Sequence, residues 1–153
     1  MPGLKHAPLL TLTLTVDFRG MTGIGQTPAG LRRIAPVTGG TFAGERLNGT
    51  VVGGADWVIN RPDGVMVIDV RLTLSTDDGA LIYLTYQGRF LAEPEAMARF
   101  GRGAVLDPAE YSLAITARFE CGDPRYSWLN NVLAVGTGEQ TATGPIYSIY
   151  EIG

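Results

Sequence analysis

The chain has 153 residues, of which 45% are hydrophobic and 18% charged, and its formal net charge is −3. Such a chain can bury one hydrophobic core, which excludes a disordered protein and predicts a single domain over residues 1–153. The acidic balance argues against nucleic acid as a partner, and no block of like charge or long apolar run indicates a membrane. Residues 1–8 are expected to be ragged and carry no signal-peptide pattern, so we expect a cytoplasmic protein.

Short apolar runs separated by turn residues follow one another along the chain. Residues 10–18 alternate apolar side chains with threonine or aspartate, as in a half-buried strand, and residues 20–30 are predicted to form a glycine-rich loop. Further strands are predicted at 31–37, 41–52 (a strand pair), 55–60, 65–75, 80–90, 111–121, 127–136 and 146–152. The one predicted helix covers residues 93–100, where Pro94 suits the first turn.

Turn chemistry supports this succession of strands. The chain holds 21 glycines and 9 prolines, and Pro62-Asp63-Gly64 and Asp77-Asp78-Gly79 are favoured turn sequences. The regular spacing predicts an all-β fold, a single antiparallel β-barrel of about eight to ten strands with one short helix.

The longer strands leave open which face turns inward. In residues 65–75 one face is wholly apolar, and the other carries Asp69 and Arg71. In the first interpretation the apolar faces form the core, as is usual for antiparallel sheets, and the pattern alone favours it. In the second, the mixed faces line the lumen and bind a polar ligand. Because a short acid and a planar base pair well when partly buried, we predict that Asp69, Arg71 and Arg118 point into the barrel.

The signatures of common catalytic classes are missing. There is no phosphate-binding loop and no serine nucleophile elbow, and the sequence has a single histidine, His6, and a single cysteine, Cys121. These two residues cannot build a tetrahedral nitrogen and sulfur site, and a lone cysteine cannot form an intrachain disulfide. We therefore expect no metal and no cofactor.

A set of short motifs nevertheless occurs in a distinctive order. The motifs are Gly30-Leu31-Arg32-Arg33-Ile34, Thr38-Gly39-Gly40-Thr41-Phe42, Gly53-Gly54-Ala55-Asp56-Trp57, Asp63-Gly64, Asp69 with Arg71, Thr76-Asp77-Asp78-Gly79 and Tyr126-Ser127-Trp128-Leu129-Asn130. Together they resemble the UPF0311 family, also called DUF3237, from about residue 10 to the end of the chain. The resemblance implies a compact β-barrel without a generally assigned activity. Residues 92–107 are longer than the core of that family needs, which suggests an insertion or a lid.

The polar residues of these motifs suggest one site for acid–base chemistry. Asp56 and Asp69 are candidate catalytic bases and Arg71 their electrostatic partner, because buried carboxylates can move protons and arginine can stabilise an enolate. Asp56 and Trp57 are adjacent on a strand, so one of the two faces the lumen. The candidate substrate-binding residues supply charge, aromatic walls and an amide: Arg33, Trp57, Tyr83, Arg118, Trp128 and Asn130.

The sequence thus predicts a barrel that binds a small molecule. The leading hypothesis is a metal-free acid–base enzyme of lyase, isomerase or cyclase type, acting on an oxygenated, anionic organic compound. The alternative is a non-catalytic, lipocalin-like binding protein. If the polar faces turn inward, the apolar outer faces need cover, so we also expect a homo-oligomer, most simply a dimer.

Overall fold

The computed structural model describes residues 2–153, which form nine strands, one α-helix and two 3-10 segments. The strands are β1 (His6–Val16), β2 (Thr22–Thr27), β3 (Gly30–Ala43), β4 (Asn48–Asn60), β5 (Met66–Thr76), β6 (Leu81–Ala92), β7 (Tyr111–Glu120), β8 (Leu133–Gln140) and β9 (Pro145–Ile152). The helix α1 spans Pro94–Gly101, and the 3-10 segments are η1 (Pro108–Glu110) and η2 (Pro124–Asn131). None of the helices in this part of the chain is long and apolar enough to cross a membrane.

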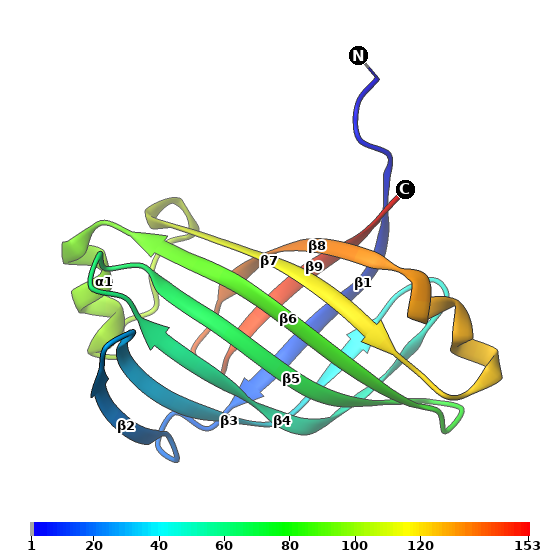
Figure 1. The fold of residues 1–153 in the computed structure, drawn as a ribbon, viewed down its shortest axis with the longest axis horizontal. Helices are drawn as coiled ribbons and strands as arrows, with labels where there is room; N and C mark the ends of the chain where they lie inside the picture. Colours follow the sequence, from blue (N-terminus) through cyan, green and yellow to red (C-terminus); the bar gives the residue numbers. More distant parts are fainter. Residues whose placement is uncertain (1) are drawn as a thin grey trace.

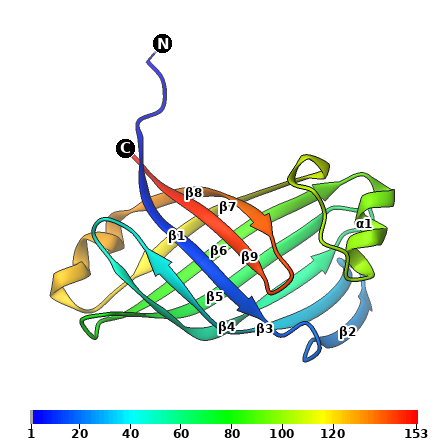
Figure 2. The ribbon, with the colours of Figure 1, turned by 180° about the vertical axis from the view of Figure 1, so that it is seen from behind.

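The strands close into a barrel through β3. The sheet order is β1-β9-β8-β7-β6-β5-β4-β3-β2, and β1 also pairs with β3. β4 lies along one side of β3, while β2 and then β1 share its other side. Eight strands therefore form a closed antiparallel barrel and β2 is an extra strand, as Figure 1 and Figure 2 show from opposite sides. This confirms the predicted all-β barrel.

Two strands occupy segments where the sequence predicts none. Residues 22–27 form β2 instead of a loop, and β1 begins at His6, within the segment expected to be ragged. β2 is held by backbone pairing with β3, and His6 pairs with Ile152 of β9, beside the chain ends in Figure 1. All side chains of β2 are exposed or half-buried. Because neither face of β2 covers the core, no apolar alternation marks it in the sequence.

The predicted inward direction of Asp69, Arg71 and Arg118 is wrong. Arg71 and Arg118 are exposed and Asp69 is half-buried, all on the outer face. The side chains of β5 that fill the lumen are the apolar ones, none more than 6% exposed: Met66, Ile68, Val70, Leu72 and Leu74. An eight-stranded barrel is just wide enough for its own side chains. Burying each large apolar side chain stabilises the fold by about 1.5–3 kcal/mol, whereas a buried unpaired charge destabilises it.

The two ends of the barrel differ. Near η2 the lumen is closed by apolar side chains that are at most 2% exposed, including Phe42, Leu47 and Leu129. The Arg46 guanidinium also lies 4.1 Å from the ring centroid of Trp128 at this end. At the opposite end, α1 and the loop that follows it lie beside the mouth of the barrel (Figure 1). The cavity described next opens at that mouth.

Candidate active site

A cavity of about 940 Å³ occupies the α1 end of the lumen. Most of its lining is apolar and comes from the strands and from α1, including Leu14, Val16, Val37, Met66, Ile68, Met97 and Phe100. The polar side chains that reach it from the strands are Arg33, Asp56, Asn60, Tyr86, Gln140 and Tyr147. An apolar pocket with a few converging polar groups is typical of a small-molecule site.

Asp56 is the acidic side chain of this cavity. The β4–β5 pairing is interrupted next to it, and the backbone N–H of Asp69 donates to Asp56 Oδ1 at 3.0 Å. Burial raises the pKa of Asp56 from 3.8 to about 6, and it outweighs the lowering effect of that hydrogen bond. A carboxyl group with a pKa this close to neutrality can both accept and donate a proton at physiological pH.

Arg33 lies on β3 opposite Val58, so its diagonal neighbours on β4 are Asp56 and Asn60. Its Nη2 donates to Asn60 Oδ1 at 2.6 Å, and it forms no ion pair with Asp56. Within residues 2–153, Arg33 Nε is a buried side-chain nitrogen without a hydrogen-bond partner. The guanidinium therefore keeps both its charge and part of its donor capacity for another group.

Two tyrosines complete the polar part of the cavity. Tyr86 of β6 and Tyr147 of β9 are each 2% exposed, and their rings meet edge to face with centroids 5.1 Å apart. Burial raises the pKa of both hydroxyls, and the Asp56 carboxyl adds to the effect. Both tyrosines therefore stay neutral across the physiological range and can donate hydrogen bonds to a ligand.

Positive charge exceeds negative charge around the cavity. Three arginines, Arg19, Arg33 and Arg102, contribute to its lining, whereas Asp56 is its one carboxylate. Among residues 2–153, no three histidine, cysteine, aspartate or glutamate side chains cluster as metal ligands. The three arginines can therefore bind an anionic oxygen group of a ligand directly.

The helix α1 forms one wall of the cavity. Met97 and Phe100 line it, and the ring of Phe100 stacks on that of Phe90 at 4.8 Å between centroids. Arg99 joins the helix to η1 through an ion pair with Glu110, and it also pairs with Glu95 within the helix at 2.7 Å. Residues 92–107 therefore contribute to the pocket, and their movement as a lid stays a prediction.

Several predicted site residues lie on the outer face of the barrel. Trp57 follows Asp56 and faces away from the lumen, where the Arg71 guanidinium lies 5.1 Å from the ring centroid of Trp57. Tyr83 is 42% exposed. Asp69, Arg71, Tyr83 and Arg118 line a separate hollow over β5 to β8 on the outer face. Neither they nor Trp57 line the lumen cavity.

Trp128 and Asn130 belong to the closed end near η2. Trp128 packs under Arg46. The Asn130 side chain accepts from the Cys121 N–H at 2.8 Å and donates to the Cys121 carbonyl at 2.9 Å. Asn130 thus holds η2 to the end of β7, and Trp128 holds it to the β3–β4 loop. Of the predicted site residues, the structure brings Asp56 and Arg33 together in the cavity.

Sequence reasoning missed Asn60, Tyr86 and Tyr147. Tyr86 shares a face with Ile82 and Leu84, and Tyr147 shares one with Ile149. On such faces a tyrosine looks like a large core residue. For the two tyrosines, the available signal was that a hydroxyl on an otherwise aliphatic inward face needs a polar partner. For Asn60, the signal was its place on the same face of β4 as Asp56.

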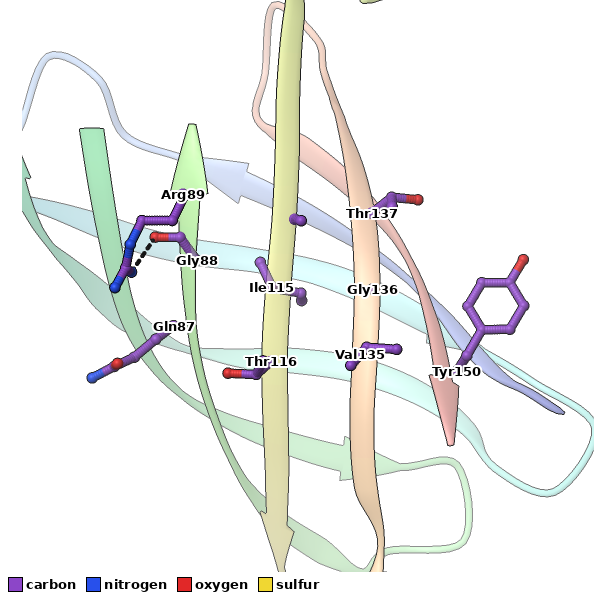
Figure 3. A pocket seen from close by; sticks show the side chains of 10 residues that line it. Gln87, Gly88, Arg89, Ile115, Thr116, Val135, Gly136, Thr137 and Tyr150 are labelled. Atoms are coloured by element: carbon purple, nitrogen blue, oxygen red, sulfur yellow. Dashed lines mark hydrogen bonds between the residues drawn. The ribbon is translucent and has the colours of Figure 1, made fainter. Parts of the chain in front are cut away.

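A second hollow, of about 600 Å³, lies on the outside of the barrel over β6 to β9. Figure 3 shows that Gln87, Arg89, Thr116 and Thr137 point away from the strands there, with Tyr150 at one side. Arg89 Nη1 donates to the carbonyl of Gly88 at 3.0 Å, the hydrogen bond drawn in Figure 3. This hollow lacks an acid, so it offers no acid–base pair.

The fold is an eight-stranded antiparallel β-barrel with one extra strand, closed at the η2 end and holding a largely apolar cavity with a few polar side chains at the α1 end. The chain belongs to the DUF3237 family, "Protein of unknown function (DUF3237)", whose sequence profile matches residues 2–152. This confirms the resemblance seen in the sequence motifs.

Solved relatives share the fold over the full chain. A UPF0311 protein of Rhodopseudomonas palustris is 32% identical over 141 residues, which cover 92% of each chain. The crystal structure of the conserved protein of unknown function from this organism matches with a TM-score of 0.93 at 30% identity, over 100% of both chains. A β-barrel-like protein of Acinetobacter baumannii AYE matches with a TM-score of 0.85 at 38% identity, over 100% of this chain and 98% of its own.

A relative with a named activity is also present. The hydroalkoxylation enzyme phnH of Penicillium herquei is 31% identical over 112 residues, which cover 73% of this chain and 60% of that protein. The crystal structure of an enzyme from the same fungus matches with a TM-score of 0.74 at 24% identity, over 100% of this chain and 98% of its own, which is a likeness of fold. At least one relative of this chain is therefore an enzyme.

Proposed function

We propose that this protein is an acid–base enzyme of lyase or cyclase type, which adds the O–H bond of a hydroxyl group across a carbon–carbon double bond of an oxygenated, anionic organic compound. The observation that carries the proposal is the buried Asp56, with a pKa of about 6, in one cavity with an Arg33 that pairs with Asn60 and forms no ion pair with Asp56. The name of the fungal relative phnH gives the reaction class independent support.

The cavity supplies what such a reaction needs. The Asp56 carboxylate takes the proton of the ligand hydroxyl while the oxygen of that hydroxyl bonds to one alkene carbon. The protonated Asp56 then gives a proton to the other alkene carbon. One O–H bond and one C=C π bond break, and one C–O and one C–H bond form, so the carboxylate is regenerated. Arg33 stabilises negative charge on oxygen, and the neutral hydroxyls of Tyr86 and Tyr147 orient the ligand.

The apolar walls fit the rest of such a substrate. Met97 and Phe100 of α1 line the cavity together with apolar side chains of the barrel strands, so an apolar part of the substrate can displace water next to the reacting groups. In water the hydroxyl oxygen would exchange hydrogen bonds with solvent. In the cavity its available polar partners are the side chains named above.

The second candidate function is non-catalytic binding in the manner of a lipocalin. The largely apolar lining of the lumen favours it, because retention of an apolar ligand needs no acid. The two functions differ in one measurable respect: an enzyme changes the bound compound and a binding protein releases it unchanged.

The test is turnover in D2O of a phenol that carries an alkenyl group next to its hydroxyl. We expect a cyclic ether with one deuterium on carbon, detected by mass spectrometry, and loss of this product in Asp56→Asn. The matched control is Asp77→Asn, an exposed turn residue that we expect to keep the wild-type rate. Tight binding of such phenols with no product would support the binding protein instead, and full activity of Asp56→Asn would exclude Asp56 as the acid–base group.

A further inference from the structure

Asn60 and Asp56 compete for the same arginine. Both lie on the inward face of β4, on either side of Val58, the residue opposite Arg33 on β3. The diagonal neighbours of a strand residue are within reach of a long side chain, so Arg33 can turn to either of them. It turns to Asn60, at 2.6 Å.

This choice is chemically informative. A guanidinium matches a carboxylate with two parallel hydrogen bonds, and such charge-assisted pairs are the stronger ones. Here the neutral amide oxygen of Asn60 occupies Nη2 and leaves Nε unpartnered within residues 2–153. An amide oxygen orients the guanidinium without cancelling its charge. The cavity therefore presents an oriented guanidinium that is held outside any direct ion pair, with Arg19 and Arg102 adding charge of the same sign.

We propose that Asn60 is a positioning residue, which holds the Arg33 guanidinium away from Asp56 and so leaves its positive charge for an anionic oxygen group of the ligand, a carboxylate, phenolate or enolate. The proposal rests on the proposed function for the location of the ligand in the lumen. Beyond that function, the proposal assigns to Asn60 the preference of the cavity for ligands with an anionic oxygen group.

The same geometry sets the ionisation of Asp56. The charged and titratable groups around this carboxyl are Arg33 and Arg32 of β3, Asp69 of β5, Tyr86 of β6 and Tyr147 of β9. Burial and the Asp69 charge favour its neutral form, while the Asp69 N–H and the two arginines favour its ionised form. If Arg33 moved from Asn60 to Asp56, a direct ion pair would lower the Asp56 pKa.

The first measurement is the titration of Asp56 by carbon-13 NMR of its carboxyl carbon. In Asn60→Ala we expect Arg33 to turn to Asp56 and the titration midpoint to fall by about one pH unit or more. In Asn60→Asp we expect Arg33 to stay in place, so that the midpoint does not fall. A role for Asn60 in stability alone would leave both midpoints at the wild-type value, and that result would overturn the proposal.

The second measurement is calorimetric binding of 2-naphthoate and of its neutral analogue 2-naphthamide at pH 7. We expect the wild type to prefer the carboxylate. Asn60→Asp, which has nearly the same shape, should bind 2-naphthoate about tenfold more weakly and 2-naphthamide as before, because the new carboxylate neutralises Arg33. Equal wild-type affinities for the two probes, or no binding of 2-naphthoate, would overturn the proposal.

A control variant separates the effect of Asn60 from that of an added negative charge. Asn131→Asp adds the same charge at an exposed position and should match the wild type in both measurements. If Asn60→Ala does not fold, the binding of the two naphthalene probes to the isosteric Asn60→Asp decides the proposal. Neither measurement needs turnover, so a failure of the hydroxyl-addition assay leaves this proposal standing, and a failure here leaves that assay standing.

Discussion

Arg33 and Asp56 are diagonal neighbours across the β3–β4 pair, yet they share a cavity without forming an ion pair. This separation matters for both groups. A direct ion pair would lower the pKa of Asp56 and would occupy the hydrogen-bond donors of the Arg33 guanidinium. In this barrel the separation leaves Asp56 with a pKa of about 6 and Arg33 with free donors.

We expect Asp56→Asn to stabilise the protein above pH 6. The pKa of Asp56 is higher in the folded state, about 6, than its ordinary value of 3.8, so the folded protein binds this proton more tightly than the unfolded chain. Stability is therefore lost as pH rises from about 4 to 6, and the loss of roughly 3 kcal/mol is complete above that window. Asparagine removes the penalty and keeps an acceptor for the Asp69 N–H.

Urea unfolding at pH 4, 5, 6 and 8 measures this difference. The variant and the wild type should have similar unfolding free energies at pH 4, and the variant should be the more stable at pH 8. Parallel curves over the whole range would mean that the pKa of Asp56 is not raised by folding.

Arg71→Met should change neither the lumen nor the fold by much. The guanidinium is exposed, and its contact with Trp57, at 5.1 Å, is a surface cation–π interaction worth about 0.5–1 kcal/mol. We expect a loss of stability in that range and unchanged binding of 2-naphthoate, whereas Arg33→Met should abolish that binding. Loss of binding in Arg71→Met would place the ligand site on the outer face.

Leu84 and Tyr83, adjacent on β6, test which face is the core. Leu84 is 0% exposed and Tyr83 is 42% exposed. Leu84→Ala should cost about 2–5 kcal/mol of unfolding free energy through lost burial and the cavity that remains. Tyr83→Ala should cost about 1 kcal/mol or less. Comparable losses in denaturant melts of the two variants would contradict the observed inward face.

The homo-oligomer remains a prediction, but the reason given from the sequence, that apolar outer faces need cover, does not hold. The outer faces of the long strands are mainly polar, so they need no general cover. Exposed apolar side chains are nevertheless grouped near one end of β6 and at the start of β8, including Leu81, Tyr83 and Leu133. We expect a dimer through these residues by light scattering, and Leu133→Lys should shift it to monomer. A wild-type monomer at high concentration would exclude this assembly.

The sequence by itself determined the barrel and most of its strands. Alternation of period two marks β5, β6 and β7 because one face of each strand is buried and the other meets water, and the Asp77-Asp78-Gly79 turn joins β5 to β6 with Gly79 at a φ of +91°. It also marked Asp56 and Arg33 as candidate site residues, because they lie in two of the distinctive motifs and supply a carboxylate and a guanidinium. Mainly backbone pairing with β3 holds β2, so no alternation of apolar side chains marks this strand in the sequence.

Only the tertiary structure decided which face is inside and which residues meet. The period-two pattern favoured the apolar faces as the core without deciding it, and the narrow lumen placed the apolar faces inside and Asp69, Arg71 and Arg118 at the surface. The cavity exists because the helix α1 and its loop wall the mouth of the barrel while leaving it unfilled. The turn of Arg33 toward Asn60, and with it the state of Asp56, depends on the register between β3 and β4, because that register sets which side chains the arginine can reach.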